Sequence, residues 1–326
     1  MKVGTIGTGD ILNLILDAVK DTDDIICEAI YSRDESTGRT LAGKFGIRKV
    51  YTRLEDMLND DEVGFIYIAS PNSLHYEQAR LALEHGKNVI CEKPFTSTYS
   101  EARELAEIAK QKQLFLFEAI TTTYLPNYQI IKEQVKNLGN IKLVLCNYSQ
   151  YSSRYNKLLG GEMTNAFNPK FSGGALMDIN LYNVYFVMDL FGKPDYIRYY
   201  PNRFENGIDT SGILILQYPG FVCECSGAKD TWGVNSAQIQ GEKGFLYVTE
   251  GSNGCIQVRV TTNEYEKFFN EQEGHHQWYF EIQGITKLVR DKNYTECWKR
   301  LDRTLEVVEV IEKARKEAGI LFDADR

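Results

Sequence analysis

Residues 2–11 have the sequence KVGTIGTGDI, a short apolar strand followed at once by a Gly-x-Gly turn and the start of a helix. In a dinucleotide-binding fold the first glycine, Gly7, permits the tight turn, and Gly9 lets the backbone approach a pyrophosphate at the helix N-terminus. The third glycine of the usual Gly-x-Gly-x-x-Gly pattern is replaced by Leu12. We therefore predict dinucleotide binding here, with an ordinary strand–helix turn as the alternative.

Beyond this turn, strand-like and helix-like segments alternate through the first 120 residues. The predicted strands are Lys2–Ile6, Ile25–Tyr31, Gly64–Ala69, Asn88–Cys91 and Leu114–Glu118. A capping box at Thr98–Glu101 opens one of the intervening helices. Short connections with this rhythm are typical of a doubly wound parallel sheet, so residues 1–120 are predicted to form an α/β nucleotide-binding domain.

The rhythm changes after residue 120 and predicts an α+β domain over residues 121–326. Alternating or apolar runs separated by Gly, Asn and Asp have the spacing of an antiparallel sheet. The predicted strands are Ile141–Gln150, Ile213–Tyr218, Phe221–Ser226, Ala237–Gln240, Phe245–Thr249 and Ile256–Val260. The predicted helices are Asn127–Val135, Ala175–Phe191, Gln277–Val289 and Cys297–Glu317, and the stretch before Gly174 is loop-like.

The composition limits the class of partner. The net charge is −8 and no block of Lys or Arg stands out, which argues against a nucleic acid or an anionic membrane as the main partner. No apolar run approaches the length of about 18 residues that a membrane span needs. The seven cysteines are scattered, lack Cys-x-x-Cys spacing and are expected to be reduced; with no signal-peptide pattern, we expect a cytoplasmic protein. His275 and His276 have no metal-like partners, so no metal site is predicted.

The end of the second predicted strand should select the cofactor ribose. Ser32 and Arg33 come first there and offer a hydroxyl donor and a guanidinium suited to a 2′-phosphate. An acidic residue at this place would bind the 2′-hydroxyl instead, and Asp34 is the candidate for that alternative. NADP is therefore predicted as the cofactor, with NAD as the alternative.

Further cofactor contacts are expected where the next two strands end. The segment Ser70-Pro71-Asn72 should pass under the nicotinamide ribose, and His75 would touch cofactor or substrate unless it is a capping or packing histidine. Glu92 would bind the cofactor ribose or remain a solvated carboxylate. The full set of predicted cofactor-binding residues is Gly7, Thr8, Gly9, Asp10, Ile11, Ser32, Arg33, Ser70, Pro71, Asn72, His75, Glu92 and Lys93.

Lys93 is the most informative single residue. The strand-like run Asn88–Cys91 ends abruptly at Glu92-Lys93-Pro94, because proline has no N–H and disfavours a helical residue before it. In an open parallel sheet the carboxyl ends of the strands form the crevice where ligands bind. A lysine placed there can titrate, donate a proton or hold an anion.

Three separated segments together resemble the Gfo/Idh/MocA family, the relatives of glucose–fructose oxidoreductase and inositol dehydrogenase. They are GTG at residues 7–9, SPNSLH at 70–75 followed by GKNVICEKP at 86–94, and GGALMDINLY at 173–182. The resemblance covers nearly the whole chain. It implies an N-terminal Rossmann domain and a C-terminal open-faced sheet, through which we expect a homodimer or homotetramer to form.

The resemblance also implies the catalytic residues. Family members usually carry Asp-x-Gly-x-His in the last segment, and Asp178 and Tyr182 occupy those positions here. A tyrosine in place of the histidine is similar to the dihydrodiol dehydrogenase branch, which is NADP-linked. Lys93 and Tyr182 would then move the hydroxyl proton during hydride transfer, and Asp178 would orient the substrate or Lys93. The alternative for Asp178 and Tyr182 is a helix-surface pair.

The expected function is hydride transfer between nicotinamide and a secondary hydroxyl or carbonyl of a sugar, polyol or cyclic diol. Two alternatives remain open: glycoside hydrolysis by transient oxidation with tightly held NAD, and a non-catalytic, cofactor-sensing regulator on the same fold. Candidates for lining a sugar-sized pocket are Tyr124, Tyr155, Asn156 and Trp232.

Overall fold

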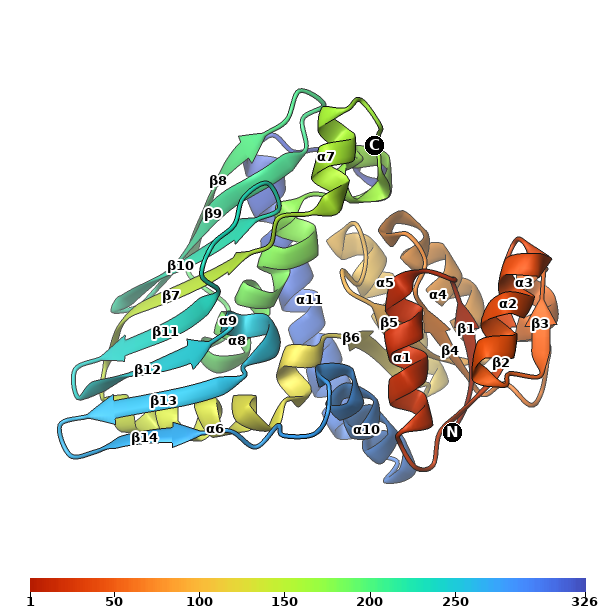
Figure 1. The fold of residues 1–326 in the computed structure, drawn as a ribbon, viewed down its shortest axis with the longest axis horizontal. Coiled ribbons are helices and arrows are strands. Elements are labelled where there is room, and N and C mark those ends of the chain that lie inside the picture. The colour runs from red at the N-terminus through yellow and green to blue at the C-terminus, as the bar shows by residue number, and fades with distance from the viewer. The chain divides into compact units, whose positions relative to one another are not determined.

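The computed structural model describes residues 1–326, which divide into two compact units. The first unit comprises Met1–Ala119 and Trp278–Leu305, and the second comprises Ile120–Gln277 and Glu306–Arg326. Each unit contains one sheet with helices packed on it (Figure 1). The segment Trp278–Leu305 therefore groups with the N-terminal residues, although the sequence pattern placed it with the C-terminal ones.

The first unit is a six-stranded, fully parallel sheet in the order β3-β2-β1-β4-β5-β6. Its strands are β1 (Lys2–Ile6), β2 (Ile26–Tyr31), β3 (Lys49–Tyr51), β4 (Phe65–Ile68), β5 (Asn88–Glu92) and β6 (Leu116–Ala119). The helices that alternate with them are α1 (Asp10–Lys20), α2 (Glu35–Phe45), α3 (Leu54–Leu58), α4 (His75–Glu84) and α5 (Tyr99–Lys112). The predicted doubly wound sheet is confirmed. The three residues of β3 are too few to show a strand pattern in the sequence.

Two further helices complete this unit from the far end of the chain. They are α10 (Gln277–Arg290) and the first part of α11 (Tyr294–Glu317). Tyr294 stacks on Phe115 with ring centroids 4.1 Å apart, and the Cys297 thiol donates to the Leu116 carbonyl at 3.5 Å. These contacts bind the returning segment to the β6 side of the sheet, which explains why it groups with residues remote in sequence.

The second unit holds an eight-stranded sheet in the order β14-β13-β12-β11-β7-β10-β9-β8. Only the β7–β10 pair is parallel, so the predicted, mostly antiparallel sheet is confirmed. The strands are β7 (Ile141–Ser149), β8 (Tyr196–Arg203), β9 (Asp209–Tyr218), β10 (Phe221–Ala228), β11 (Ser236–Gly241), β12 (Gly244–Thr249), β13 (Gln257–Thr262) and β14 (Glu266–Phe269). The helices are α6 (Pro126–Gln134), α7 (Ser153–Leu159), α8 (Leu181–Phe191) and α9 (Gly251–Gly254).

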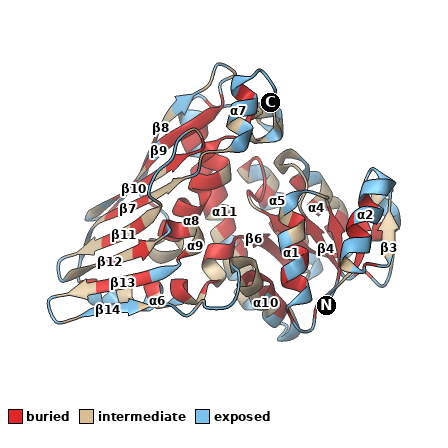
Figure 2. Cartoon of the chain, viewed as in Figure 1, coloured by how far each residue is buried: buried red, intermediate tan, exposed pale blue.

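One face of this sheet is packed and the other is open. Burial alternates along the strands, as in β9, where Leu214 and Leu216 are buried while Ile213 and Gln217 are exposed (Figure 2). The buried face packs against α8, which is apolar almost throughout. The sequence pattern did not predict β8, β14 or α7. The first two are edge strands that do not alternate clearly, and α7 lies in the stretch that looked loop-like.

Candidate functional site

The Gly-x-Gly turn has the geometry that a bound dinucleotide needs. Gly7 has φ +120°, and a Cβ there would overlap the Ala69 carbonyl oxygen, so only glycine fits. Gly9 is the N-cap of α1, and no side chain caps this helix end. A Cβ on Gly9 would meet no atom within 4 Å, so the space over the helix N-terminus is open. Leu12, in the place of the third glycine, is fully buried and packs α1 onto the sheet.

The end of β2 separates the two candidates for ribose recognition. Asp34 is the N-cap of α2, and its Oδ1 accepts hydrogen bonds from Thr37 N, Thr37 Oγ1 and Ser36 Oγ. These bonds lower the pKa of Asp34 to about 2. Arg33 is exposed and makes no hydrogen bond or ion pair within the chain. Ser32 is buried and donates to the Asp34 carbonyl at 2.7 Å. The guanidinium is thus the available ionic group at this strand end.

His75 is a packing residue in this structure. It begins α4, is fully buried, and its Nδ1 and Nε2 lie 2.9 Å from the Pro94 carbonyl oxygen and 3.0 Å from that of Ser70. Burial lowers the pKa of His75, which favours a neutral ring. The imidazole therefore joins the turn after β4 to the turn after β5, which carries Lys93.

Lys93 lies half-buried directly after β5, and the Lys93–Pro94 peptide is cis. Its neighbour Glu92 is buried, so the alternative of a solvated carboxylate is wrong. Glu92 Oε1 accepts a hydrogen bond of 2.8 Å from Tyr67 Oη, and burial raises its pKa. Two more carboxyl groups are buried in this unit: Glu118 on β6, which accepts a hydrogen bond from the Phe95 N–H, and Glu281 on α10, whose pKa is raised by burial and by both Glu92 and Glu118.

The buried carboxylate of Asp209 fixes the start of the helical segment that carries Asp178 and Tyr182. Asp209, at the start of β9, accepts hydrogen bonds from Leu176 N at 2.6 Å and from Tyr199 Oη at 2.7 Å. Gly174 makes this approach possible: its φ is +109°, and a Cβ there would overlap the Asp209 carboxylate. Leu176 begins a π-helical turn, Leu176–Asn180, that continues into α8. Such turns often occur at functional sites.

Asp178 lies within the π-helical turn and Tyr182 in the first turn of α8. The Asp178 carboxylate forms an ion pair with Lys229, whose side chain is only 5% exposed. The Tyr182 ring is buried and meets the Tyr148 ring edge-on, with centroids 5.8 Å apart. The alternative interpretation of Asp178 and Tyr182 as a solvent-exposed pair on a helix surface is therefore wrong. Sequence reasoning missed Lys229, because its partner Asp178 lies 51 residues earlier in the chain and no local pattern marks the lysine.

The structure thus gathers the predicted residues into two groups. The residues around the carboxyl ends of β1, β2, β4 and β5 belong to the first unit, and Asp178 and Tyr182 belong to the second.

Among the candidates for lining a sugar-sized pocket, Trp232 is 78% exposed and stacks on Tyr151, and Asn156 accepts a hydrogen bond from the Tyr151 hydroxyl. None of the helices has the length and apolar character needed to cross a bilayer.

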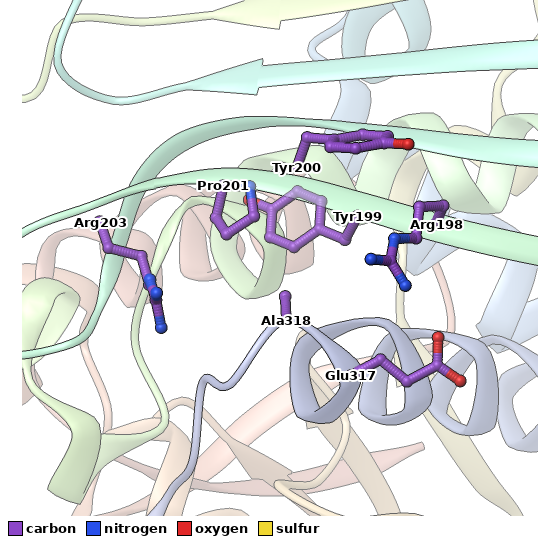
Figure 3. Close-up of a pocket in the computed structure, with 7 residues that line it drawn as sticks. All are labelled: Arg198, Tyr199, Tyr200, Pro201, Arg203, Glu317 and Ala318. Atoms are coloured by element: carbon purple, nitrogen blue, oxygen red, sulfur yellow. The ribbon is translucent and has the colours of Figure 1, made fainter.

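A separate pocket of about 230 Å³ lies in the second unit beside the edge strand β8 (Figure 3). Its lining residues are Arg198, Tyr199, Tyr200, Pro201, Arg203, Glu317 and Ala318. Figure 3 shows the two guanidinium groups at opposite ends of the pocket, with Ala318 between them. None of the predicted cofactor or catalytic residues lines this pocket, so it is not the site that the sequence points to.

Comparison with known proteins agrees with this fold. Residues 1–119 match the family model described as "Oxidoreductase family, NAD-binding Rossmann fold", and residues 128–247 match the "GFO/IDH/MocA C-terminal domain". The chain is 33% identical to scyllo-inositol 2-dehydrogenase (NADP(+)) of Bacillus subtilis, over 100% of this chain and 99% of the relative. It is 26% identical to trans-1,2-dihydrobenzene-1,2-diol dehydrogenase of Sus scrofa, over 91% and 90% of the two chains.

A solved structure gives the same result for the backbone. A 3-ketoreductase from Actinomadura kijaniata, crystallised with NADP and TDP-benzene, superposes with a TM-score of 0.84 over 97% of both chains. Sequence identity is 20%, so this likeness concerns the fold alone.

Proposed function

The chain belongs to the GFO/IDH/MocA oxidoreductase family, and from this premise we propose that it transfers a hydride between NADP and a secondary hydroxyl or carbonyl of a sugar, polyol or cyclic diol. That it is an NAD(P)-dependent oxidoreductase follows from the family. The observation that carries the finer proposal is Lys93, which directly follows β5 in a parallel sheet whose first turn is open for a dinucleotide. This strand-end position is where ligands bind in such sheets.

The residues of the first unit fit NADP. The open N-terminus of α1 offers backbone N–H groups to the diphosphate, and Gly9 leaves room for it. Arg33 suits a 2′-phosphate, while the Oδ1 of Asp34 is occupied by the helix cap. The Bacillus subtilis relative is NADP(+)-dependent by name. When bound, NADP supplies the hydride acceptor or donor.

The chain's own residues move the proton. In the oxidation direction a secondary alcohol must lose its hydroxyl proton as its carbinol hydrogen leaves as hydride. Lys93 accepts that proton at the substrate oxygen, and the Tyr182 hydroxyl shares it. Asp178 accepts a hydrogen bond from a substrate hydroxyl and so orients the ring. In reduction the same groups deliver the proton to the carbonyl oxygen.

Two coarser features complete the proposal. The open sheet face carries exposed apolar side chains on several strands, namely Tyr200, Ile213, Val222 and Phe268. Such a face favours a second copy of the chain as its partner, and hence a homodimer or homotetramer.

All seven cysteines are free, which supports a reducing compartment, and we propose that the protein is cytoplasmic.

Nicotinamide fluorescence during a screen of sugars, polyols and diols tests this proposal. With NADP, turnover of at least one uncharged secondary alcohol is expected, and Lys93→Met should lower kcat by roughly 10²–10⁴-fold while the affinity for NADP stays within a few-fold. Lys20→Met, an exposed change on α1, is the control. Unchanged turnover in Lys93→Met would refute the acid/base role. Cofactor binding without any turnover would favour the regulator, and release of free sugar without net change in NADPH would favour the glycosidase.

A further inference from the structure

The ion pair between Asp178 and Lys229 lies at the start of the predicted catalytic helix and is largely buried on its lysine side. Lys229 follows β10 directly, and its side chain is 5% exposed, whereas that of Asp178 is 30% exposed. By contrast, the ion-paired lysines Lys132, Lys157 and Lys193 of the same unit have side chains that are 42%, 55% and 46% exposed. Burial of an ammonium is costly unless a counter-charge or hydrogen-bond acceptors compensate for the lost hydration.

The backbone of Lys229 is fixed on both sides. Its N–H donates to the Thr210 carbonyl at 2.8 Å, and its carbonyl accepts from the N–H of Ser152, the N-cap of α7, at 2.9 Å. Its ammonium lies 5.4 Å from the ring centroid of Phe167. Lys229 thus connects the start of β9, the segment around α7 and the π-helical turn that carries Asp178. Because the Lys229 backbone is hydrogen-bonded on both sides and its side chain is buried, the fold determines where the ammonium lies.

We propose that the Asp178–Lys229 pair is a charge-balanced specificity element that selects uncharged cyclic polyols and sugars over their phosphorylated or acidic counterparts. The inference rests on the proposed function and specifies its substrate class. Asp178 already neutralises the buried ammonium, so a phosphate or carboxylate arriving there would compete with the Asp178 carboxylate. A neutral hydroxyl instead donates a hydrogen bond to that carboxylate without disturbing the pair.

A row of aromatic rings beside the pair fits the same class of ligand. Phe167 lies 5.8 Å from Tyr155, Tyr155 lies 5.8 Å from Tyr151, and Tyr151 stacks on Trp232 at 5.6 Å with an interplanar angle of 9°. Trp232 is 78% exposed, so the row leads from the buried pair to solvent. The C–H faces of a cyclic polyol or pyranose pack well on such rings, whereas an added phosphate gains nothing from them.

Opposite changes of charge test the proposal. Asp178→Asn removes the negative charge of the pair, and Lys229→Met removes its positive charge. The readout is the ratio of kcat/KM for a neutral substrate to that for its phosphate, using myo-inositol with inositol 1-phosphate and glucose with glucose 6-phosphate. We expect this ratio to fall roughly tenfold in Asp178→Asn and to rise in Lys229→Met, because one net charge has been changed in each direction. A residue with a merely structural role would not shift the ratio in opposite directions.

The remaining variants separate charge from damage to the fold. The double variant Asp178→Asn/Lys229→Met is neutral again and should return the ratio toward the wild-type value, and Lys229→Arg should keep it. Lys193→Met, which breaks the exposed Lys193–Glu309 pair of the same unit, should leave it unchanged. Ratios that are equal in all variants, or that move in the same direction in both single variants, would overturn the proposal.

Failure of the proposed function gives a different result. In that case the wild type turns over no compound of the whole screen of sugars, polyols and diols, and the same comparison is made by calorimetric binding of these four compounds to the NADP-loaded protein. Preferential binding of myo-inositol and glucose, reduced in Asp178→Asn, supports the charge-balanced pair without turnover. Equal or tighter binding of the two phosphates by the wild type would overturn it.

Discussion

Gly7 and Gly9 are two residues apart, yet the fold itself requires glycine only at the first of them. Gly7 has a backbone conformation that side chains rarely adopt, and it presses against the Ala69 carbonyl. Gly9 has ordinary extended angles and open space around it. Gly7 is therefore needed for the backbone turn itself, whereas Gly9 leaves room for a ligand at the N-terminus of α1.

We expect Gly7→Ala and Gly9→Ala to separate these two roles. Gly7→Ala should lower the free energy of unfolding by about 1–3 kcal/mol, because it adds both backbone strain and a steric overlap. Gly9→Ala should leave stability unchanged and weaken NADP binding at least tenfold, because its methyl group occupies the space proposed for the diphosphate. Urea denaturation and fluorescence titration with NADP measure the two effects. A stable Gly9→Ala variant with wild-type affinity would show that the cofactor does not approach this turn.

At the scale of the element, one carboxylate, that of Asp209 at the start of strand β9, holds the helical segment that leads into α8. Asp209 accepts hydrogen bonds from Leu176 N and Tyr199 Oη while fully buried, and burial raises its pKa. It occupies the usual place of a helix-capping side chain, although it lies 33 residues further along the chain than Leu176. The π-helical turn with Asp178 begins at this anchor.

Graded removal of the anchor should give graded losses of stability. Tyr199→Phe removes one donor and should cost about 1 kcal/mol, whereas Asp209→Ala leaves two buried donors unsatisfied and should cost about 2–4 kcal/mol. Asp209→Ala should also lower kcat more than it weakens NADP binding, since the affected helix belongs to the second unit. Equilibrium unfolding in urea and steady-state kinetics provide the comparison. Equal stability of the two variants would contradict this account of the helix start.

The last turn of α11 carries a second anchor, which responds to pH. Arg315 is buried, stacks over the Phe322 ring and binds both oxygens of Asp325. This pairing lowers the pKa of Asp325 to about 2, against burial, which acts in the opposite direction. A carboxyl with a lowered pKa in the folded state stabilises the fold above its unfolded pKa, and that contribution disappears as the pH falls toward its folded pKa.

Asp325→Asn should therefore be less stable than the wild type at pH 6 by about 2 kcal/mol. The difference should shrink between about pH 4 and pH 2, where the wild type loses its advantage through protonation. Urea unfolding at pH 6, 4 and 3 follows the difference directly. Asp323→Asn, a neighbouring change outside the Arg315 contacts, is the control. A difference that is constant with pH would mean that the ion pair is not the source of the stability.

At the scale of the whole molecule, the sequence predicted features that depend on neighbouring residues, such as strand ends, and missed those that depend on contacts between distant parts of the chain. The strand ends at Gly7, Ser32 and Lys93 were readable because a turn glycine, a polar residue or a proline follows an apolar run. Lys229 and Glu281 were not readable, because their importance depends on partners about 50 to 190 residues away in the chain. The return of α10 to the first unit was hidden for the same reason: its amphipathic pattern predicts a helix but not the sheet against which it packs.

Glu281 is the clearest consequence of that return. It lies on α10, is fully buried, and neither of its carboxylate oxygens has a hydrogen-bond partner. Burial, with Glu92 and Glu118 adding to it, raises its pKa well above the usual value. A carboxyl whose pKa is raised in the folded state binds more protons folded than unfolded, so stability falls as the pH rises above the unfolded pKa. Glu281 thus makes the fold weaker at neutral and alkaline pH than at pH 5.

Glu281→Gln should remove this penalty, because the amide is uncharged at every pH and can donate to Glu92 or Glu118. We expect the variant to gain about 1–3 kcal/mol over the wild type at pH 8 and clearly less at pH 5, as measured by urea unfolding. Glu55→Gln, an exposed change on α3, should show no such dependence. Destabilisation of Glu281→Gln that grows with pH would contradict this account, because it would mean that the ionised carboxylate is favoured in the folded state.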